Sequence, residues 1–118
     1  MIYRDELECC PRCGTDLVQA GSVRACAACQ GLWVEEEMLV AMAANMFAPA
    51  RRVPIPLVPQ SRPPLPCPIC RDAMGTWTLH AVAIDRCASH GLWFDHHELQ
   101  IVLRAIGDPV YRRRLEDR

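Results

Sequence analysis

Hydrophobic and polar positions follow the same order twice along the chain, on either side of a proline-rich segment. In the first stretch, short runs at 15–20 and 22–25 flank Gly21 and predict a small β-hairpin. In the second stretch, β-branched and aromatic residues at 75–80 and 81–86 predict a longer hairpin. Alternation in this second hairpin places four apolar side chains on one face: Trp77, Leu79, Ala81 and Ala83.

A helix is predicted after each hairpin. Three glutamates precede the helix at 38–47, where negative charge suits the first turn. This helix is apolar on nearly every side, which favours burial against more than one neighbour. Asp95 and Glu98 resemble a capping box for the second helix at 96–106, which carries an apolar stripe at helical spacing.

The repetition extends to short motifs. Cys-Pro-x-Cys at 10–13 returns at 67–70, and Gly-Leu-Trp at 31–33 returns at 91–93. Between the copies, seven prolines fix backbone φ and predict an extended, semi-rigid spacer. The expected division is a first module at 9–48, a proline-rich linker at 49–66, a second module at 67–108 and a short basic C-terminal helix or tail at 109–118.

Each module is too short to fold on apolar burial alone. Units of about 40 to 50 residues need a metal, disulfides or a partner. The cysteine spacing separates these options, because one of the four ligand pairs is C-x-x-H, whose histidine cannot form a disulfide. In the first module, two C-x-x-C pairs separated by twelve residues predict a tetrahedral zinc site. Its four thiolate ligands are Cys10, Cys13, Cys26 and Cys29.

The second module carries an imidazole in place of one thiolate. Its ligand pairs are separated by sixteen residues, and one nitrogen donor favours zinc over a four-sulfur iron site. Alignment on Gly-Leu-Trp shows one residue missing before Gly91, a gap that the longer histidine side chain can span. An exposed histidine beside a glycine turn is the alternative interpretation. The predicted ligands are Cys67, Cys70, Cys87 and His90.

Other chemically capable residues are assigned lesser roles. Cys9 has the wrong spacing to join its neighbours and is interpreted as a spare thiol. The remaining histidines are expected at the surface: His80, His96 and His97. Of these, His97 is a reserve metal ligand. Trp33 and Trp93 follow the last ligand of their modules, where an indole ring can cover the metal site and pack against the helix, although an ordinary role in the core is the preferred interpretation.

The composition limits the choice of partner and compartment. Net charge is −1, from 13 arginines and 14 acidic residues, and neither module carries the strong basic face that phosphate binding requires. The first residues turn acidic at once and lack the pattern of a secretory signal, so we expect a reducing cytoplasm. The longest apolar run is about half of a membrane span, so no membrane association is expected.

The motifs together carry a resemblance to a known family. Cys-Pro-x-Cys, a hairpin, Cys-x-x-Cys or Cys-x-x-His before Gly-x-Trp, and a short helix resemble the transcription-factor-IIB-type zinc-finger family of small bacterial proteins. The resemblance covers about 9–47 and 67–106. It implies a small metal-stabilised α+β fold of two tandem zinc ribbons, each a β-hairpin with a short C-terminal helix, and structural zinc at the eight ligand positions. Glu35 and the Glu37-Met38 step depart from the family pattern at the first helix start.

The closed ligand sets bear on function. Four protein ligands leave no position for water or substrate, which argues against an enzyme and a small-molecule substrate. The sequence also lacks a glycine-rich phosphate loop and an H-E-x-x-H motif. Zinc storage requires exchangeable metal, whereas closed sites favour tight structural metal.

Two non-catalytic functions are expected to compete. The leading hypothesis is a protein-interaction module, open to a regulatory role, that binds a protein partner or a second copy through the apolar first helix and the proline spacer. The alternative is a transcription-linked nucleic-acid binder. Its phosphate contacts would come from six arginines: Arg51, Arg52, Arg62, Arg112, Arg113 and Arg114.

Overall fold

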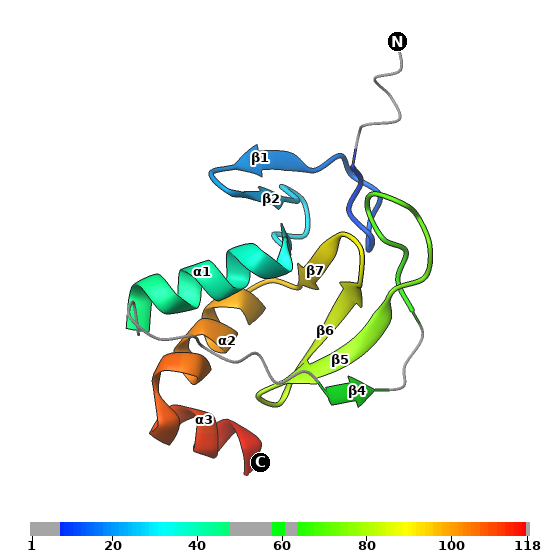
Figure 1. Cartoon of the computed structure of the whole chain (residues 1–118). Helices are drawn as coiled ribbons and strands as arrows, with labels where there is room; N and C mark the ends of the chain where they lie inside the picture. The colour runs from blue at the N-terminus through cyan, green and yellow to red at the C-terminus, as the bar shows by residue number, and fades with distance from the viewer. Residues whose placement is uncertain (1–7, 48–57, 61–63, 118) are drawn as a thin grey trace.

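The computed structural model describes residues 8–47, 58–60 and 64–117 (Figure 1). We refer to 8–47 as the first half and to 64–117 as the second half. The first half contains β1 (Val18–Ala20), β2 (Val23–Ala25), β3 (Leu32–Val34) and α1 (Glu36–Phe47). The second half contains β5 (Gly75–Leu79), β6 (Val82–Cys87), β7 (Gly91–Phe94), α2 (Glu98–Gly107) and α3 (Pro109–Glu116). The short strand β4 (Val58–Gln60) lies between them in sequence.

The strands of the described residues form one antiparallel sheet. Its seven strands follow the order β1-β2-β3-β7-β6-β5-β4, so β3 and β7 join the two halves at its middle. Trp33 lies directly opposite Trp93 in this pairing. The flanking pairs are Leu32 with Phe94 and Val34 with Leu92. Each half therefore has a third strand in addition to its predicted hairpin and helix. These two strands, β3 and β7, connect the halves.

The sheet separates two apolar clusters. Side chains alternate between the faces of a strand, so the two tryptophans point away from the face to which their strand neighbours point. One cluster gathers residues of α1 and α2 with the sheet: Val34, Leu39, Leu79, Ile84, Leu92, Phe94, Leu99 and Val102. The other gathers both tryptophans with cysteines: Cys10, Cys26, Trp33, Cys67, Met74 and Trp93. Both indole rings are buried, which confirms the prediction that they belong to the core. They do not pack against the helices, which lie on the opposite face.

The second hairpin differs from the prediction in its alternation. His80 and Ala81 form its turn, with φ of 50° and 72°. Because these two residues leave the strands, alternation restarts in β6, and Trp77 pairs with Ile84. Cross-strand partners share a face, so Ile84 occupies the face that was predicted for Ala81 and Ala83. That part of the prediction is wrong.

The helices lie close to their predicted positions. α1 begins at Glu36, two residues before the expected start. α2 begins at Glu98, two residues after the expected start, because His97 has φ of 72° and occupies the N-cap position. The backbone N–H of Asp95 donates to the Glu98 carboxylate at 2.9 Å, which is one half of the predicted capping box. No helix of the described ranges has the length and apolar character needed to cross a membrane.

The third helix starts as the sequence predicts. Asp108 caps α3, and its carboxylate accepts hydrogen bonds from the backbone N–H groups of Val110 and Tyr111 at 3.0 and 3.1 Å. Pro109 occupies a first-turn position, where its missing N–H is not needed. The predicted cap and first helical position are therefore confirmed.

Part of the predicted linker belongs to the sheet. β4 pairs with β5, with Pro59 opposite Trp77, and Pro66 forms an isolated bridge with Ala73. Proline is accepted in such an edge strand because its missing N–H faces away from the ladder. Residues 58–60 of the predicted linker are therefore paired with the second half. Residues 48–57 and 61–63 lie outside the described residues, and the module boundaries stay a prediction.

Candidate metal centres

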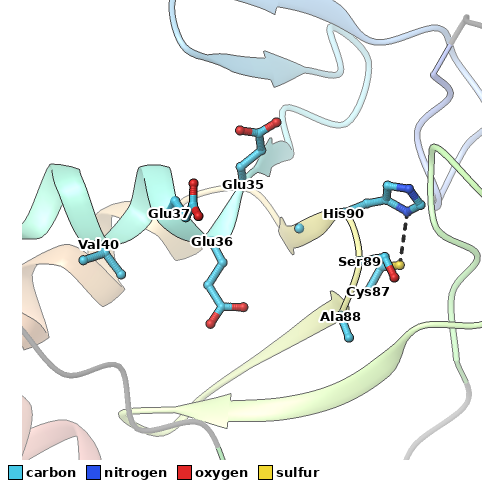
Figure 2. A pocket seen from close by; sticks show the side chains of 9 residues that line it. Glu35, Glu36, Glu37, Val40, Cys87, Ala88, Ser89 and His90 are labelled. Atoms are coloured by element: carbon cyan, nitrogen blue, oxygen red, sulfur yellow. Dashed lines mark hydrogen bonds between the residues drawn. The ribbon is translucent and has the colours of Figure 1, made fainter.

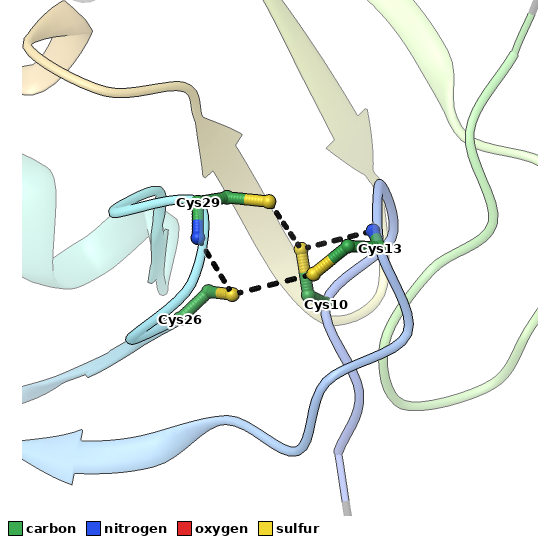
Figure 3. A group of neighbouring side chains, drawn as sticks. All are labelled: Cys10, Cys13, Cys26 and Cys29. Carbon is green, nitrogen blue, oxygen red and sulfur yellow. Dashed lines mark hydrogen bonds between the residues drawn. The ribbon is translucent and has the colours of Figure 1, made fainter.

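Two tight turns hold the sulfur atoms of the first cluster (Figure 3). Gly14 N–H donates to the carbonyl of Cys10 at 2.9 Å, and Gln30 N–H donates to the carbonyl of Cys26 at 2.7 Å. Gly14 and Gln30 have φ of 81° and 65°, so each turn closes in the left-handed region. Backbone N–H groups also donate to sulfur, including Cys29 N–H to Cys26 Sγ at 3.2 Å. These bonds orient the sulfurs and stabilise thiolate charge.

The sulfur positions match a tetrahedral metal site. Cys10 Sγ lies 3.9 Å from Cys29 Sγ, and Cys13 Sγ lies 3.6 Å from Cys26 Sγ. All four sulfurs lie within 4.8 Å of one another. A tetrahedron with zinc–sulfur bonds of 2.3 Å has sulfur–sulfur edges of about 3.8 Å. The four predicted residues are therefore brought together at a spacing that fits zinc.

The pKa values within this cluster diverge. The Thr15 hydroxyl lies 3.2 Å from Cys13 Sγ, and hydrogen bonding to Thr15 lowers the pKa of Cys13 to about 6. Hydrogen bonding with Cys13 raises the pKa of Cys29 to about 12, and burial adds to this shift. Neighbouring thiols resist joint ionisation because their negative charges repel. A divalent cation would remove this repulsion, so the donor set suits a metal held by four thiolates.

The second cluster is built in the same way from the second half. Cys67 and Cys70 lie in a turn closed by the Arg71 N–H, which donates to the Cys67 carbonyl at 2.9 Å. Cys87 ends β6, and His90 follows in the turn before β7. His90 Nδ1 lies 3.4 Å from Cys87 Sγ and 3.7 Å from Cys67 Sγ. Burial raises the pKa of Cys67 to about 11.

His90 joins the cluster that was predicted for it. Its Nδ1 and the three sulfurs lie within 4.8 Å of one another, and Cys70 Sγ lies 3.9 Å from Cys87 Sγ. A tetrahedral zinc site with one nitrogen ligand has sulfur–nitrogen edges of about 3.6 Å, close to the distances found. Figure 2 shows the His90 ring directed toward Cys87. The side chains thus fit zinc at this site also.

The residues given lesser roles lie outside both clusters. Cys9 Sγ is 3.6 Å from Asp16 Oδ1 and 3.9 Å from Arg71 Nη2. His80 Nδ1 is 3.3 Å from Glu116 Oε2, where it connects the second hairpin to α3. His97 bonds with Gln100, so it does not replace His90 as a ligand.

A pocket of about 490 Å³ lies between the second metal cluster and the start of α1 (Figure 2). Residues of both halves line it: Glu35, Glu36, Glu37, Val40, Cys87, Ala88, Ser89, His90 and Gly91. Glu36 is paired with Arg86 at 2.9 Å. The nucleophile and the imidazole of this pocket, Cys87 and His90, both belong to the metal cluster. The other polar side chains that line the pocket are Ser89 and the glutamates.

A polar link between the halves was not predicted. Arg12 lies between Cys10 and Cys13, and its guanidinium donates to both carboxylate oxygens of Asp95, at 2.5 and 2.8 Å. Asp95 Oδ1 also accepts from Trp93 Nε1 at 3.0 Å. The second half has Ile69 in the place of Arg12, so comparison of the copies gave no signal for this contact. The equivalent indole nitrogen, Trp33 Nε1, is buried without a hydrogen-bond partner among the described residues.

The described fold is a small α+β protein with one antiparallel sheet and two cysteine-rich clusters that fit zinc. Residues 66–105 match the model of the family described as "Transcription factor zinc-finger", a zinc-ribbon family. The match includes the second cluster and covers one copy of the repeat. No curated protein and no solved structure matches the chain. The family match and the two clusters support a zinc-binding domain.

Proposed function

We propose that this protein is a non-catalytic pair of tandem zinc ribbons that binds two structural zinc ions and acts as a protein-interaction module. The observation that carries the proposal is the closure of each cluster by four donor atoms within 4.8 Å. A zinc ion with four protein ligands has no open position for water, so it stabilises structure and does not activate a substrate.

The outer side of α1 supports a protein partner. Leu39 and Ala43 face inward and are buried, and Met38 and Met42 pack partly against the core. Ala41 is exposed on the same helix. From 38 to 44 the helix has no charged residue, and the exposed Glu37 lies one turn before Ala41. A surface of this kind accepts close packing by another protein.

The described arginines give less support to nucleic-acid binding. Arg24 pairs with Glu8 at 3.0 Å, Arg86 pairs with Glu36, and Arg12 pairs with Asp95. Paired arginines lose part of their attraction for phosphate because the neighbouring carboxylate cancels their charge. Arg113 and Arg114 are exposed on α3, where they are accessible for contact with phosphate. Arg51, Arg52 and Arg62 lie outside the described residues.

Ala41→Glu is expected to abolish partner binding while leaving the fold intact. Glutamate suits an exposed helical position, but a charge buried unpaired in an interface costs about 3–5 kcal/mol, so binding should weaken by about a hundredfold or more. The matched control is Ala20→Glu, the same change at an exposed alanine on β1. The measurement is quantitative mass spectrometry of proteins retained from native extract by the immobilised full chain, together with sedimentation of the chain alone.

The outcomes separate the two candidate functions. The interaction module is supported by binding or self-association that persists in Ala20→Glu and is lost in Ala41→Glu. This binding should also be unchanged by moderate salt. Retention of nucleic acid that falls steeply with salt supports the alternative, because phosphate contacts release counterions. Binding through α1 is contradicted if the natural sequence and the Ala41→Glu variant retain every protein in equal amounts.

A further inference from the structure

The strands that join the two halves also follow directly on the metal ligands. Cys26 and Cys29 precede β3, and Cys87 and His90 precede β7. These two strands pair with each other through three residue pairs. The position of each strand therefore depends on the metal cluster of its own half, and its hydrogen-bonding partner depends on the cluster of the other half.

The tryptophan of each half packs against a glycine of the other half. A Cβ atom added at Gly31 would lie 2.2 Å from Cζ2 of Trp93, and one added at Gly91 would lie 3.2 Å from Cζ2 of Trp33. Real Cβ atoms do not approach a ring carbon at 2.2 Å, so Gly31 requires the absence of a side chain. Trp33 and Trp93 are 1% and 0% exposed. The turn that holds the last ligand of one half thus forms the packing surface for the other half.

The Arg12–Asp95 ion pair connects the same parts. The backbone N–H of Arg12 donates to Cys10 Sγ at 3.3 Å, so this residue belongs to the first metal turn. Its side chain reaches Asp95, which lies between β7 and α2 in the second half. The orientation of the first metal turn and that of the second helix start are therefore linked by one bidentate contact.

Both buried clusters take residues from the two halves. The cluster around the tryptophans takes Cys10, Cys26 and Trp33 from the first half and Cys67, Met74 and Trp93 from the second. The other cluster takes Val34 and Leu39 from the first half and its remaining six residues from the second. The first half has 40 described residues, about the size below which a chain usually needs a metal or a partner to fold. Ordering of the first half therefore requires the surface that the second half provides, and the second half completes both clusters only with the first.

We propose that the two sites bind zinc cooperatively, so that the first ion orders both halves and the second ion enters a site that is already formed. The proposal rests on the zinc binding proposed above. An ion that binds a disordered site must also order the chain, whereas an ion that binds an ordered site does not, and the difference appears as coupling between the sites. Coupling between sites in one protein typically changes affinity by about 5–150-fold, and it acts equally in both directions.

The test is a zinc titration of the full, metal-free chain followed by native mass spectrometry. At half-saturation, coupling of this size should leave the one-zinc form at between about a tenth and a third of the molecules, with the rest divided between metal-free and two-zinc forms. Two independent sites of equal affinity would give about half, and unequal independent sites would give more. A one-zinc form at half of the molecules or more overturns the proposal.

A variant locates the coupling in the contact between the halves. Gly31→Ala displaces the Trp93 ring without altering a metal ligand. The one-zinc form should therefore rise to about half of the molecules or more. The matched control is Gly75→Ala, where the added Cβ would come no closer than 3.1 Å, to the Trp77 indole nitrogen, and where the titration should resemble that of the natural sequence. If Gly31→Ala does not fold, the titration of the natural sequence still decides.

Failure of the proposal is distinguishable from failure of zinc binding itself. Uptake of two zinc ions through an abundant one-zinc form contradicts cooperativity and leaves the structural role of zinc in place. Uptake of fewer than two zinc ions at saturation contradicts both.

Discussion

Removal of zinc with a strong chelator will unfold the whole protein. Structural zinc in small domains contributes about 10–16 kcal/mol of apparent binding free energy, which equals or exceeds the 5–15 kcal/mol total stability of typical domains. Trp33 and Trp93 are buried in the cluster that also contains ligand cysteines, so their near-ultraviolet circular dichroism should collapse on chelation. Addition of zinc should restore the signal.

Matched cysteine variants show whether the effect comes from the clusters. Cys26→Ser removes a buried sulfur of the first cluster and leaves one site to order both halves, so the signal should collapse at a lower chelator concentration than in the natural sequence. Cys9→Ser removes a thiol that lies outside both clusters and should leave the signal unchanged. A chelated protein that keeps its circular dichroism and still unfolds cooperatively would show that the fold does not depend on metal.

Trp93→Ala will cause the largest loss of stability among substitutions that leave both ligand sets intact. Replacing a fully buried tryptophan with alanine costs about 3–5 kcal/mol, because apolar contact is lost and a cavity remains. Trp93 also donates to Asp95 and packs on Gly31, so the contact between the halves is weakened as well. The measurement is urea unfolding in excess zinc, which keeps both sites saturated.

Trp77→Ala is the control for this prediction. Trp77 is only half-buried at the outer part of the sheet, and Arg86 lies over its ring at 5.3 Å. Its removal exposes less of the core and should cost distinctly less free energy than Trp93→Ala. If the two variants lose equal stability, the middle of the sheet is not the principal contact between the halves.

The metal clusters could be predicted from sequence because their determinants are local. A C-x-x-C pair forms within one turn, and the repeat placed the equivalent pairs side by side for comparison. The same comparison indicated the one-residue gap before Gly91 that His90 spans. The two clusters contain the eight predicted residues, and each ligand role remains a prediction until metal is measured.

The joining of the halves could not be predicted, because it depends on contacts between distant residues. β3 has three residues and β7 has four, too few for an alternating pattern to mark a strand. The Arg12–Asp95 pair joins residues 83 positions apart, and the repeat holds no second copy of it. Proline-rich composition likewise concealed β4, because an edge strand accepts proline without showing it in the pattern.

The described residues form one folding unit with two four-donor clusters. The sheet runs through both halves, and the buried tryptophans meet at its middle. Gly31 leaves room for the Trp93 ring, and Gly91 leaves room for the carbonyl oxygen of Val34 and the Trp33 ring. This arrangement also places α1 and α2 together on one face, with the metal clusters on the other.

The central claim is that two four-donor clusters hold zinc and thereby maintain this sheet. The most direct test is elemental analysis of the folded full chain, purified without added metal or chelator, by mass spectrometry of its metal content. The account predicts two zinc ions per chain. Folded protein that contains no bound metal, or that contains iron in place of zinc, would contradict it.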